Sequence, residues 1–331
     1  MDIERDNEYI YVSQKSYITR MAAEYQSLLA TYRGNPSLGS TARRVIKARA
    51  RLQMAQRGED HQDTAEEEDD EAEEEPKEPT PRDWRALLGK DLLTVNGTLQ
   101  AIANATRPDI TYYTGLIARH ADKPTKEVWE LAAKLVIHLV RTKDRTLRYG
   151  GQKMRDQLKN KSMIVRAYSD ADWSKEYHGH SIAGRAIEVG GCLIHWGANK
   201  LSTPTTSTCD SEFGAPHMAR SHMVQVTELL RELGYKEESP TFMTDNEGAK
   251  KACRSAKFPD LTRSKWTREL LLRNVVRMGL WKVEKIAAED NIADAFTKPL
   301  LPNKEREMWR KWVERGWWRM EEATTITPVQ S

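Results

Sequence analysis

The spacing of apolar residues divides the chain into a helical first half and a second half in which strands and helices alternate. An alternating stretch at Tyr9–Val12 predicts one short strand, and residues 14–32 then carry apolar side chains at helical spacing. Asp83 is placed to cap the helix that follows it, and Thr125 to cap a longer helix with an apolar stripe over residues 129–140. The first half is therefore expected to be mainly helical.

The second half opens with Met163–Trp173, which reads MIVRAYSDADW. Its short apolar run predicts a buried strand that delivers Asp170 and Asp172 to the margin of a sheet. Because successive strand side chains point to opposite faces, these two acids would share a face if the strand continued through them. A strand-end Asp is by itself more often a turn or cap residue, but a buried carboxylate needs a partner or a cation.

Glycines and prolines separate the elements that follow this strand. The predicted order is strand (163–173), strand (181–191), strand (192–200), helix (211–233), strand (240–250), helix (267–279), strand (280–288) and helix (290–298). Gly190 and Gly191 form a predicted hairpin turn between two of these strands. Gly234 ends the predicted helix over residues 211–233. Residues 304–320 predict a C-terminal helix whose four tryptophans serve packing rather than base stacking.

Charge is distributed unevenly along the chain. Between Glu59 and Glu78 lie thirteen acidic residues and a single lysine, so this stretch carries a charge of −12 although the whole chain has a formal charge of +3. The remaining residues together therefore carry +15, which suits a polyanionic partner. The basic stretch 42–57 is equally consistent with a solvated helix face and with a nucleic-acid contact.

Composition also limits the location and class of the protein. The acidic start, MDIERDNEYI, lacks the features of a signal peptide, and no apolar run approaches the ~20 residues that span a bilayer. Cys192, Cys209 and Cys253 lack CxxC spacing, which favours free thiols in a reducing compartment. We therefore expect a cytoplasmic protein with no membrane partner, a location compatible with a virus-like particle or with access to the nucleus. No glycine-rich phosphate loop supports nucleotide hydrolysis.

Four acids occupy positions from which they can converge above one sheet edge. Asp170 and Asp245 end predicted strands, Glu212 starts a predicted helix, and Asp294 lies near the last helix. Four carboxylates that lie together resist full ionisation unless divalent cations neutralise them, and oxygen ligands favour Mg²⁺ or Mn²⁺ over zinc. Two such ions ~3.5–4 Å apart can activate a water and stabilise the leaving oxygen of a phosphodiester. The pattern indicates a nuclease.

Several motifs resemble a known family. YSDADW, TSTCDSEFGA, TDNEGA and DNIADAFTKPL, in this order, resemble the ribonuclease H domain of copia-type retrotransposon polyproteins. Upstream, YVSQKSYI, ANATRPDI and KPTKEVWELAAKLVIHLVRTKD resemble the end of that family's reverse transcriptase. The closing NIADAFTKPL and the TRPDI segment are the most specific of these motifs. The resemblance covers nearly the whole chain apart from the acidic stretch and the last few residues.

The resemblance implies both a fold and a site. The expected fold is α/β: a ribonuclease H-like mixed five-stranded sheet with flanking helices, preceded by a mainly helical reverse-transcriptase remnant. The family's metal-binding acids fall on Asp170, Glu212, Asp245 and Asp294, with Mg²⁺ or Mn²⁺ as cofactor, whereas Asp172 would be a neighbour rather than a ligand. The implied activity is hydrolysis of the RNA strand of an RNA–DNA hybrid. The remainder of the retroelement polyprotein would be a further partner.

The domain organisation implied by the resemblance has five parts. They are the first part of a reverse transcriptase C-terminal remnant (1–57), an acidic disordered linker (58–82), a helical thumb- or connection-like segment (83–155), a ribonuclease H-like domain (160–302), and a C-terminal helix and tail (303–331). The linker assignment rests on composition, because like charges, three prolines and the absence of large apolar residues cannot offset the entropy of ordering.

Some positions depart from the family pattern. The polymerase's paired aspartates, in a Tyr-x-Asp-Asp string, are absent, so no polymerase activity is expected from this chain alone. Gly214 and Pro216 fall in what should be the first turn of the helix that carries Glu212, and Trp266 replaces a usual histidine. These departures leave open a second hypothesis: a non-catalytic nucleic-acid-binding or interaction protein derived from such an element. His178 and His180 could share a strand face but have no third ligand nearby, so an exposed loop is the better interpretation.

The linker hypothesis can be tested by limited proteolysis of the free protein. An unfolded acidic segment should be cut before any other part of the chain, with the first cleavages between about Gly58 and Pro81, because proteases act on accessible, unstructured backbone. Mass spectrometry of the early fragments locates the cuts. Protection of this segment while other regions are cut would contradict the hypothesis.

Overall fold

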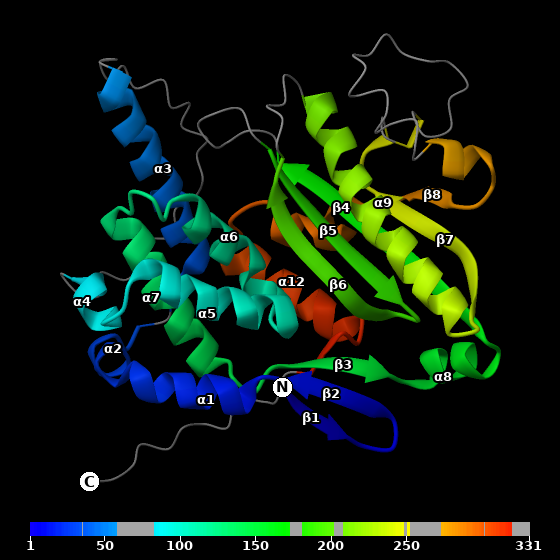
Figure 1. Cartoon of the computed structure of the whole chain (residues 1–331), viewed down its shortest axis with the longest axis horizontal. Helices are drawn as coiled ribbons and strands as arrows, with labels where there is room; N and C mark the ends of the chain where they lie inside the picture. Colours follow the sequence, from blue (N-terminus) through cyan, green and yellow to red (C-terminus); the bar gives the residue numbers. More distant parts are fainter. Residues whose placement is uncertain are drawn as a thin grey trace.

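The computed structural model describes residues 1–34, 36–57, 83–172, 181–201, 208–247, 250–251, 273–300 and 302–319. The predicted linker, the His178 and His180 pair, Cys253 and Trp266 lie outside the described residues. Two units stand side by side in Figure 1, with helices on one side and a five-stranded sheet on the other. No described helix is long and apolar enough to cross a membrane.

The helical unit is assembled around one central helix. Its elements are α1 (Lys15–Glu24), α2 (Gln26–Thr31), α3 (Leu38–Arg57), α4 (Trp84–Leu88), α5 (Leu92–Ala105), η1 (Pro108–Ile110), α6 (Thr111–Arg119) and α7 (Lys126–Arg141). Helix α7 is central because nearly every residue from Val128 to Leu139 is buried, as its apolar stripe predicts. Asp83 caps α4 as expected, accepting a hydrogen bond from the Ala86 amide, whereas Thr125 precedes α7 without a capping bond.

A small sheet lies beside this unit that local sequence patterns did not predict. Its antiparallel order is β1 (Asp2–Arg5), β2 (Tyr9–Ser13), β3 (Thr146–Gly150) and β9 (Trp318–Arg319). Only β2 was expected, and residues 146–150 were expected to be helical. Strands this short are stabilised by pairing with distant segments, which periodicity along the chain does not reveal. The sheet joins strands from the first, third and last predicted domains, whose boundaries remain a prediction.

The second unit is the expected mixed five-stranded sheet. Its order is β6 (Cys192–Lys200), β5 (Ile182–Val189), β4 (Ser162–Asp172), β7 (Lys236–Thr244) and β8 (Lys282–Lys285). Strands β4, β5 and β6 form an antiparallel meander, whereas β7 runs parallel to β4, and β8 parallel to β7. The predicted hairpin turn is present, because Gly190 and Gly191 adopt φ values of 62° and 85°, which glycine accommodates most readily. The ribonuclease H-like fold class is therefore confirmed.

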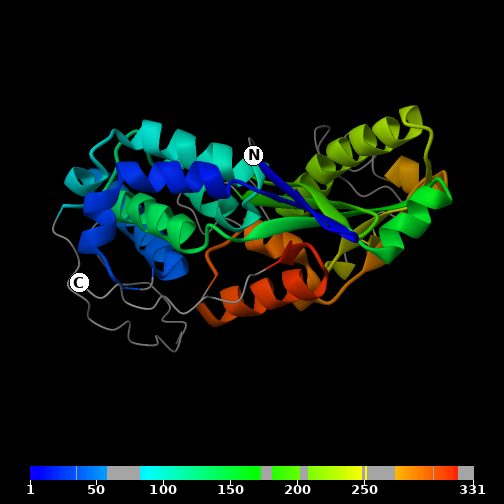
Figure 2. The same ribbon diagram turned by 90° about the horizontal axis from the view of Figure 1, so that it is seen from below.

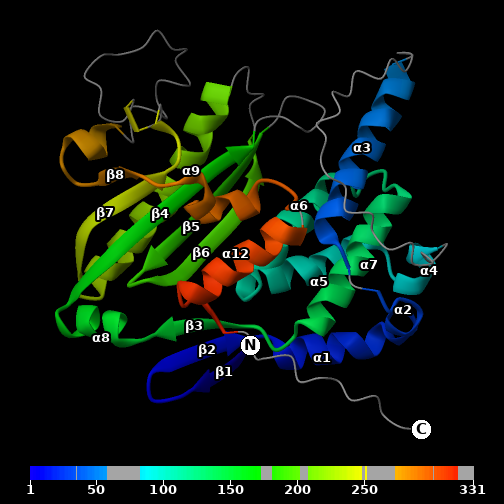
Figure 3. The same ribbon diagram turned by 180° about the vertical axis from the view of Figure 1, so that it is seen from behind.

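Helices cover both faces of this sheet, as Figures 2 and 3 show from below and from behind. Helix α9 (Thr208–Glu232) packs on one face through an apolar cluster that includes Val165, Ile187 and Met223. The other face is covered by the 3₁₀ segment η3 (Ile292–Phe296) and by α12 (Pro302–Glu314). Two shorter elements, α8 (Gln152–Lys159) and η2 (Ala288–Asp290), are also present.

The C-terminal tryptophans belong to this second layer. Trp309 and Trp312 lie on α12, while Trp317 and Trp318 follow its end, and all four are buried in one cluster. The Trp317 indole donates to Glu188 on β5 at 2.9 Å. Their packing role is thus confirmed. The helix itself is shorter than expected, because Gly316, at φ 79°, turns the chain into β9.

A buried ion cluster connects the helical unit to this C-terminal segment. Arg107 and Asp109, from the TRPDI motif, form a bidentate pair with distances of 2.9 and 2.6 Å, and both side chains are almost fully buried. His138 of α7 contacts the same carboxylate at 2.9 Å, and Arg145 approaches it at 3.5 Å. The Arg145 guanidinium also lies 4.5 Å from the ring centroid of Trp309. His138 is therefore a hydrogen-bonded core histidine.

Removing Asp109 should destabilise the protein strongly. In Asp109→Ala, Arg107 stays buried without its carboxylate, and an unpaired buried charge costs about 3–5 kcal/mol. The matched control is Asp122→Ala, which removes an exposed carboxylate 3.4 Å from Arg49 and should change stability by less than about 1 kcal/mol. Urea denaturation of both variants measures the difference, and equal effects would show that the cluster does not stabilise the fold.

Candidate active site

Parallel pairing of β4 and β7 brings two of the predicted acids to one edge of the sheet. The register pairs Tyr168 with Met243, so two residues further along each strand come Asp170 and Asp245. Both acids line a cavity of about 190 Å³ at the carboxyl ends of these strands. The short apolar strands predicted from sequence therefore deliver their terminal carboxylates to a common place.

The segment η3 brings the third acid, Asp294, to the same edge. Asp170 lies opposite Gly184 in the β4–β5 register, and η3 packs directly over that glycine. A Cβ atom at Gly184 would stand 2.5 Å from the Ala293 carbonyl oxygen, so only glycine allows η3 to approach so closely. The sequence predicted an α-helix over residues 290–298, whereas the chain forms two 3₁₀ turns, η2 and η3, separated by Asn291.

Asn291 holds η3 against the ends of β4 and β7 through hydrogen bonds. This role was not predicted from the sequence. Its side-chain oxygen accepts from the Ala293 amide at the start of η3, while its Nδ2 donates to the Ser169 carbonyl at 3.0 Å and to Asp245 Oδ1 at 3.2 Å. The only sequence signal was the capping preference of asparagine immediately before IADAF. Asn291 thus orients one acid and positions the segment that carries another.

Burial and the charge of Asp294 affect the protonation of Asp170 and Asp245. Burial, the charge of Asp294 and a hydrogen bond between the two carboxyl groups raise the pKa of Asp170 to about 7, against the opposing effects of Thr297 and Lys298. Burial and the Asp294 charge also raise the pKa of Asp245, opposed in part by the Asn291 hydrogen bond. The geometry therefore places Asp170, Asp245 and Asp294 within electrostatic reach of one another.

Two residues after η3 offset part of this repulsion. The Thr297 hydroxyl donates to Asp170 Oδ2, and Lys298 Nζ lies 2.7 Å from Asp294 Oδ1. Both belong to the TKPL end of the family motif, but the sequence analysis had assigned them no role. The i,i+4 spacing of Asp294 and Lys298 was the available signal.

The fourth predicted acid, Glu212, is described only through its backbone. It belongs to α9, which begins at Thr208 and covers β4, but its side chain lies outside the described part of the structure. Pro216 was expected in the first turn and instead lies inside the helix, where it lines the acidic cavity. Proline has no amide hydrogen, so the helix lacks the bond that would reach the Glu212 carbonyl four residues earlier.

The donor chemistry fits a hard divalent cation, although the described side chains do not complete a site. Across those described side chains, no three His, Cys, Asp or Glu residues are grouped closely enough to hold a metal ion. The pair Asp170 and Asp294, with Asp245 nearby, supplies only carboxylate oxygens, which Mg²⁺ and Mn²⁺ prefer. A divalent cation between clustered carboxylates would favour their ionised forms.

Sequence comparison finds relatives among transposon polyproteins. The chain is 26% identical over 226 residues to a retrovirus-related Pol polyprotein from transposon RE2 of Arabidopsis thaliana, which covers 68% of this chain. It is 28% identical over 206 residues to that of transposon RE1 from the same plant, and 26% over 209 residues to that of TNT 1-94 from Nicotiana tabacum, covering 62% and 63% of this chain. The matches span only 13–15% of the length of these polyproteins. No protein-family model matches the chain.

Structural comparison gives weaker likenesses. An RNase H1 from the archaeon Halobacterium salinarum aligns with a TM-score of 0.29 and 15% identity, covering 40% of this chain and 94% of the other. The N-terminal RNase H domain of a Mycobacterium tuberculosis protein, solved as a fusion with maltose-binding protein, aligns with a TM-score of 0.30 and 9% identity, covering 45% and 98%. Alignments at these scores carry no weight beside the strand order of the sheet itself.

Asp170→Asn should stabilise the metal-free protein at alkaline pH. The folded-state pKa of Asp170 is raised above its unfolded value, so the native state binds the extra proton and becomes less stable as pH rises from about 4 to 7. The neutral amide avoids this penalty. We expect a gain of about 1–3 kcal/mol at pH 8 in EDTA that disappears near pH 4.

The control for this stability measurement is Asp172→Asn, which removes a carboxylate from the same strand end. Thermal unfolding of wild type and both variants across this pH range measures the effect. A pH-independent change in Asp170→Asn, or an equal gain in Asp172→Asn, would contradict the assigned electrostatics.

Proposed function

Because the homologues of this chain are Pol polyproteins of copia-type transposons, we propose that its ribonuclease H-like domain is a divalent-cation-dependent endonuclease that cleaves the RNA strand of RNA–DNA hybrids. The observation that carries this proposal is the convergence of Asp170, Asp245 and Asp294 at the carboxyl edge of the sheet. Structural acids are normally paired with bases, whereas Asp170 and Asp245 share one edge with Asp294, and burial and the charge of Asp294 raise the pKa of both.

Each residue of the edge has a defined part in this proposal. Asp170, Asp245, Asp294 and Glu212 would hold Mg²⁺ or Mn²⁺. When bound, such ions activate a water and stabilise the leaving oxygen of a phosphodiester. Asn291 fixes the orientation of Asp245, and Thr297 holds one oxygen of Asp170, so the carboxylates stand in place before substrate arrives.

The substrate class follows from charge and from the homologues. The residues outside the acidic stretch carry +15, and phosphates of a nucleic acid duplex are attracted to such a surface in a salt-dependent way. Choice of the RNA strand would come from 2′-hydroxyl contacts in the wide, shallow minor groove of the hybrid. The remainder of a retroelement polyprotein, which the homologues contain and this chain does not match, would be a partner.

A second candidate function is hybrid binding without cleavage. Lys298 favours it, because its ammonium lies 2.7 Å from Asp294 and supplies positive charge where a cation would otherwise be needed. Pro216 favours it as well, since it interrupts the hydrogen bonds of α9 next to Glu212. The two candidates differ in whether the wild-type protein cuts.

The deciding experiment is an assay of the purified full chain with Mg²⁺ or Mn²⁺. We expect cleavage of the RNA of an RNA–DNA hybrid and no cleavage of duplex DNA. Asp170→Asn removes one negative ligand with little change in shape, so cleavage should fall about 10²- to 10³-fold, the effect of losing one such electrostatic group in an active site. Hybrid affinity should change by less than about threefold, because no phosphate-binding lysine or arginine is altered.

The matched control is Asp172→Asn, which should retain cleavage because that carboxylate is not a proposed ligand. Binding of hybrid by the wild type without cleavage under either metal would favour the second candidate. Equal loss of cleavage in both variants would overturn the assignment of Asp170.

A further inference from the structure

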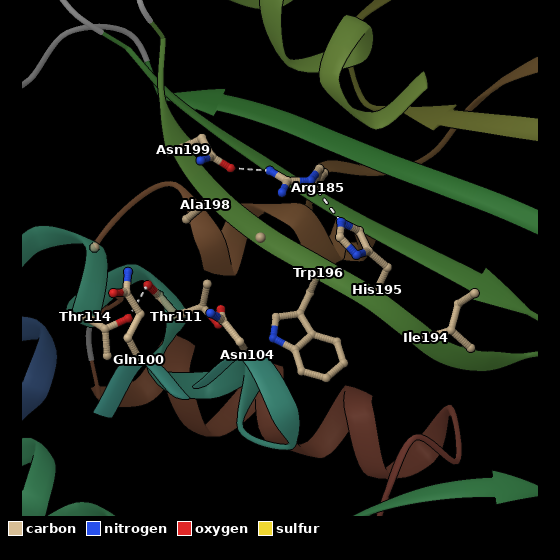
Figure 4. A pocket seen from close by; sticks show the side chains of 12 residues that line it. Gln100, Asn104, Thr111, Thr114, Arg185, Ile194, His195, Trp196, Ala198 and Asn199 are labelled. Atoms are coloured by element: carbon tan, nitrogen blue, oxygen red, sulfur yellow. Dashed lines mark hydrogen bonds between the residues drawn. The ribbon is translucent and has the colours of Figure 1, made fainter. Parts of the chain in front are cut away.

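A polar pocket of about 390 Å³ lies between the helical unit and the edge strand β6 (Figure 4). Helices α5 and α6 contribute Gln100, Asn104, Thr111 and Thr114, and the opposite wall is β6 together with Arg185 from β5. Among the described strands, β6 is at the edge of the five-stranded sheet. The indole of Trp196 donates to the Ala103 carbonyl at 2.9 Å and joins the two units beside the pocket.

Arg185 is the charged group of this pocket. Its side chain is 9% exposed and crosses β6 at Gly197, where a Cβ atom would lie 2.6 Å from the guanidinium. Glycine at this position therefore lets the arginine reach over the strand. The guanidinium donates to Asn199 Oδ1, and its Nε donates to His195 Nε2 at 3.1 Å.

Among the residues that the structure describes, Arg185 has no counter-ion. None of the residues lining the pocket is an aspartate or glutamate, and no carboxylate within the described ranges forms an ion pair with Arg185. The neighbouring imidazole of His195 stacks on His222 of α9 at 4.1 Å, and burial together with nearby positive charges lowers its pKa to about 4. A buried positive charge with only neutral neighbours is costly unless an anion accompanies it.

The wall of the pocket formed by α5 and α6 offers hydrogen-bond donors. The Thr111 hydroxyl is buried and has no hydrogen-bond partner in the described structure, so its donor is available to a ligand. The side-chain amides of Gln100 and Asn104 lie on the same wall and can also donate. A tetrahedral oxyanion would satisfy both the guanidinium and these donors.

We propose that this pocket binds a backbone phosphate of the nucleic acid substrate, with Arg185 as its charged ligand. The register places Ala198 opposite Gly184 and Gly184 opposite Asp170, so the pocket lies two strands from the acidic edge. Two strand spacings are roughly 10 Å, the scale of one groove of a duplex (~6–12 Å). This inference rests on the proposed nucleic-acid function, and it makes the helical unit part of the substrate surface.

The test measures binding of a fluorescent RNA–DNA hybrid to the full chain in EDTA, where the hybrid stays intact whether or not the protein is a nuclease. Arg185→Gln should bind the hybrid about tenfold more weakly than wild type, because it loses one phosphate contact. It should also lower the slope of log affinity against log salt by about 0.9. Gly197→Ala keeps the arginine but displaces its guanidinium, and should reproduce most of the loss.

The control is Arg231→Gln, which removes an exposed arginine, paired with Glu237, near the end of α9 and should leave both affinity and salt slope unchanged. Circular dichroism and the melting temperature show whether each variant folds. If Arg185→Gln does not fold, Arg185→Lys replaces it in the test. This variant keeps the charge and should retain part of the hybrid affinity. Inorganic phosphate should compete with the hybrid in wild type and not in Arg185→Gln.

Unchanged hybrid affinity and salt slope in Arg185→Gln and Gly197→Ala would overturn this inference while leaving the nuclease proposal intact. In another outcome, Arg185→Gln loses binding of inorganic phosphate but keeps the hybrid affinity of wild type. That result would show that the pocket binds a free anion, and it would also overturn this inference. Arg185-dependent hybrid binding by a wild type that never cuts would support this inference and contradict the nuclease.

Discussion

The repulsion between the carboxyl group of Asp170 and that of Asp294 is the constraint that organises the rest of this edge. Two such groups are held together only if their surroundings fix them and offset their charge. Gly184 allows η3 to approach, Asn291 fastens it, Thr297 donates to Asp170, and Lys298 pairs with Asp294. An arrangement that lowers stability and still recruits several supporting residues is typical of a functional site.

The two units of the chain depend on each other. The segment from α12 to β9 carries four buried tryptophans that pack on the sheet, and the same segment contacts Arg107 of the helical unit. Strand β9 then joins β3 in the small sheet. The segment that covers one face of the ribonuclease H-like sheet is anchored in the helical unit. Disruption of the Asp109 cluster would therefore destabilise both units. The pocket beside β6 extends this interdependence to a surface that both units line.

Much of the larger sheet was predictable because its signals are local. The apolar run at Met163–Tyr168, the Gly190–Gly191 turn and Gly234 each act within a few residues, and the corresponding strands, hairpin and helix end are present. Strands β3 and β9 were missed because their stability comes from pairing across as many as 173 residues, as between Thr146 and Arg319. Strand β1 pairs with the nearby β2 and was also missed. The 3₁₀ form of residues 292–296 was missed for a similar reason, since it is fitted against Gly184 on another strand.

The candidate site was predictable as a set of acids but not as an arrangement. Motif resemblance identified Asp170, Asp245 and Asp294, and the parallel β4–β7 pair places the first two abreast. Asn291, Thr297 and Lys298 act through contacts with other segments, which spacing alone does not show. Arg185 carried no motif, and its significance lies in the absence of an acid among the described residues around it, which only the folded structure reveals.

The central claim is that the acids at this edge form a divalent-cation site. Anomalous X-ray scattering from crystals grown with Mn²⁺ tests it most directly, because the metal is located without reference to activity. The account predicts Mn²⁺ between the carboxylates of Asp170 and Asp245, with Asp294 and Glu212 close to it. The account would be contradicted if crystals grown with saturating Mn²⁺ showed no anomalous peak at this edge and Lys298 still paired with Asp294.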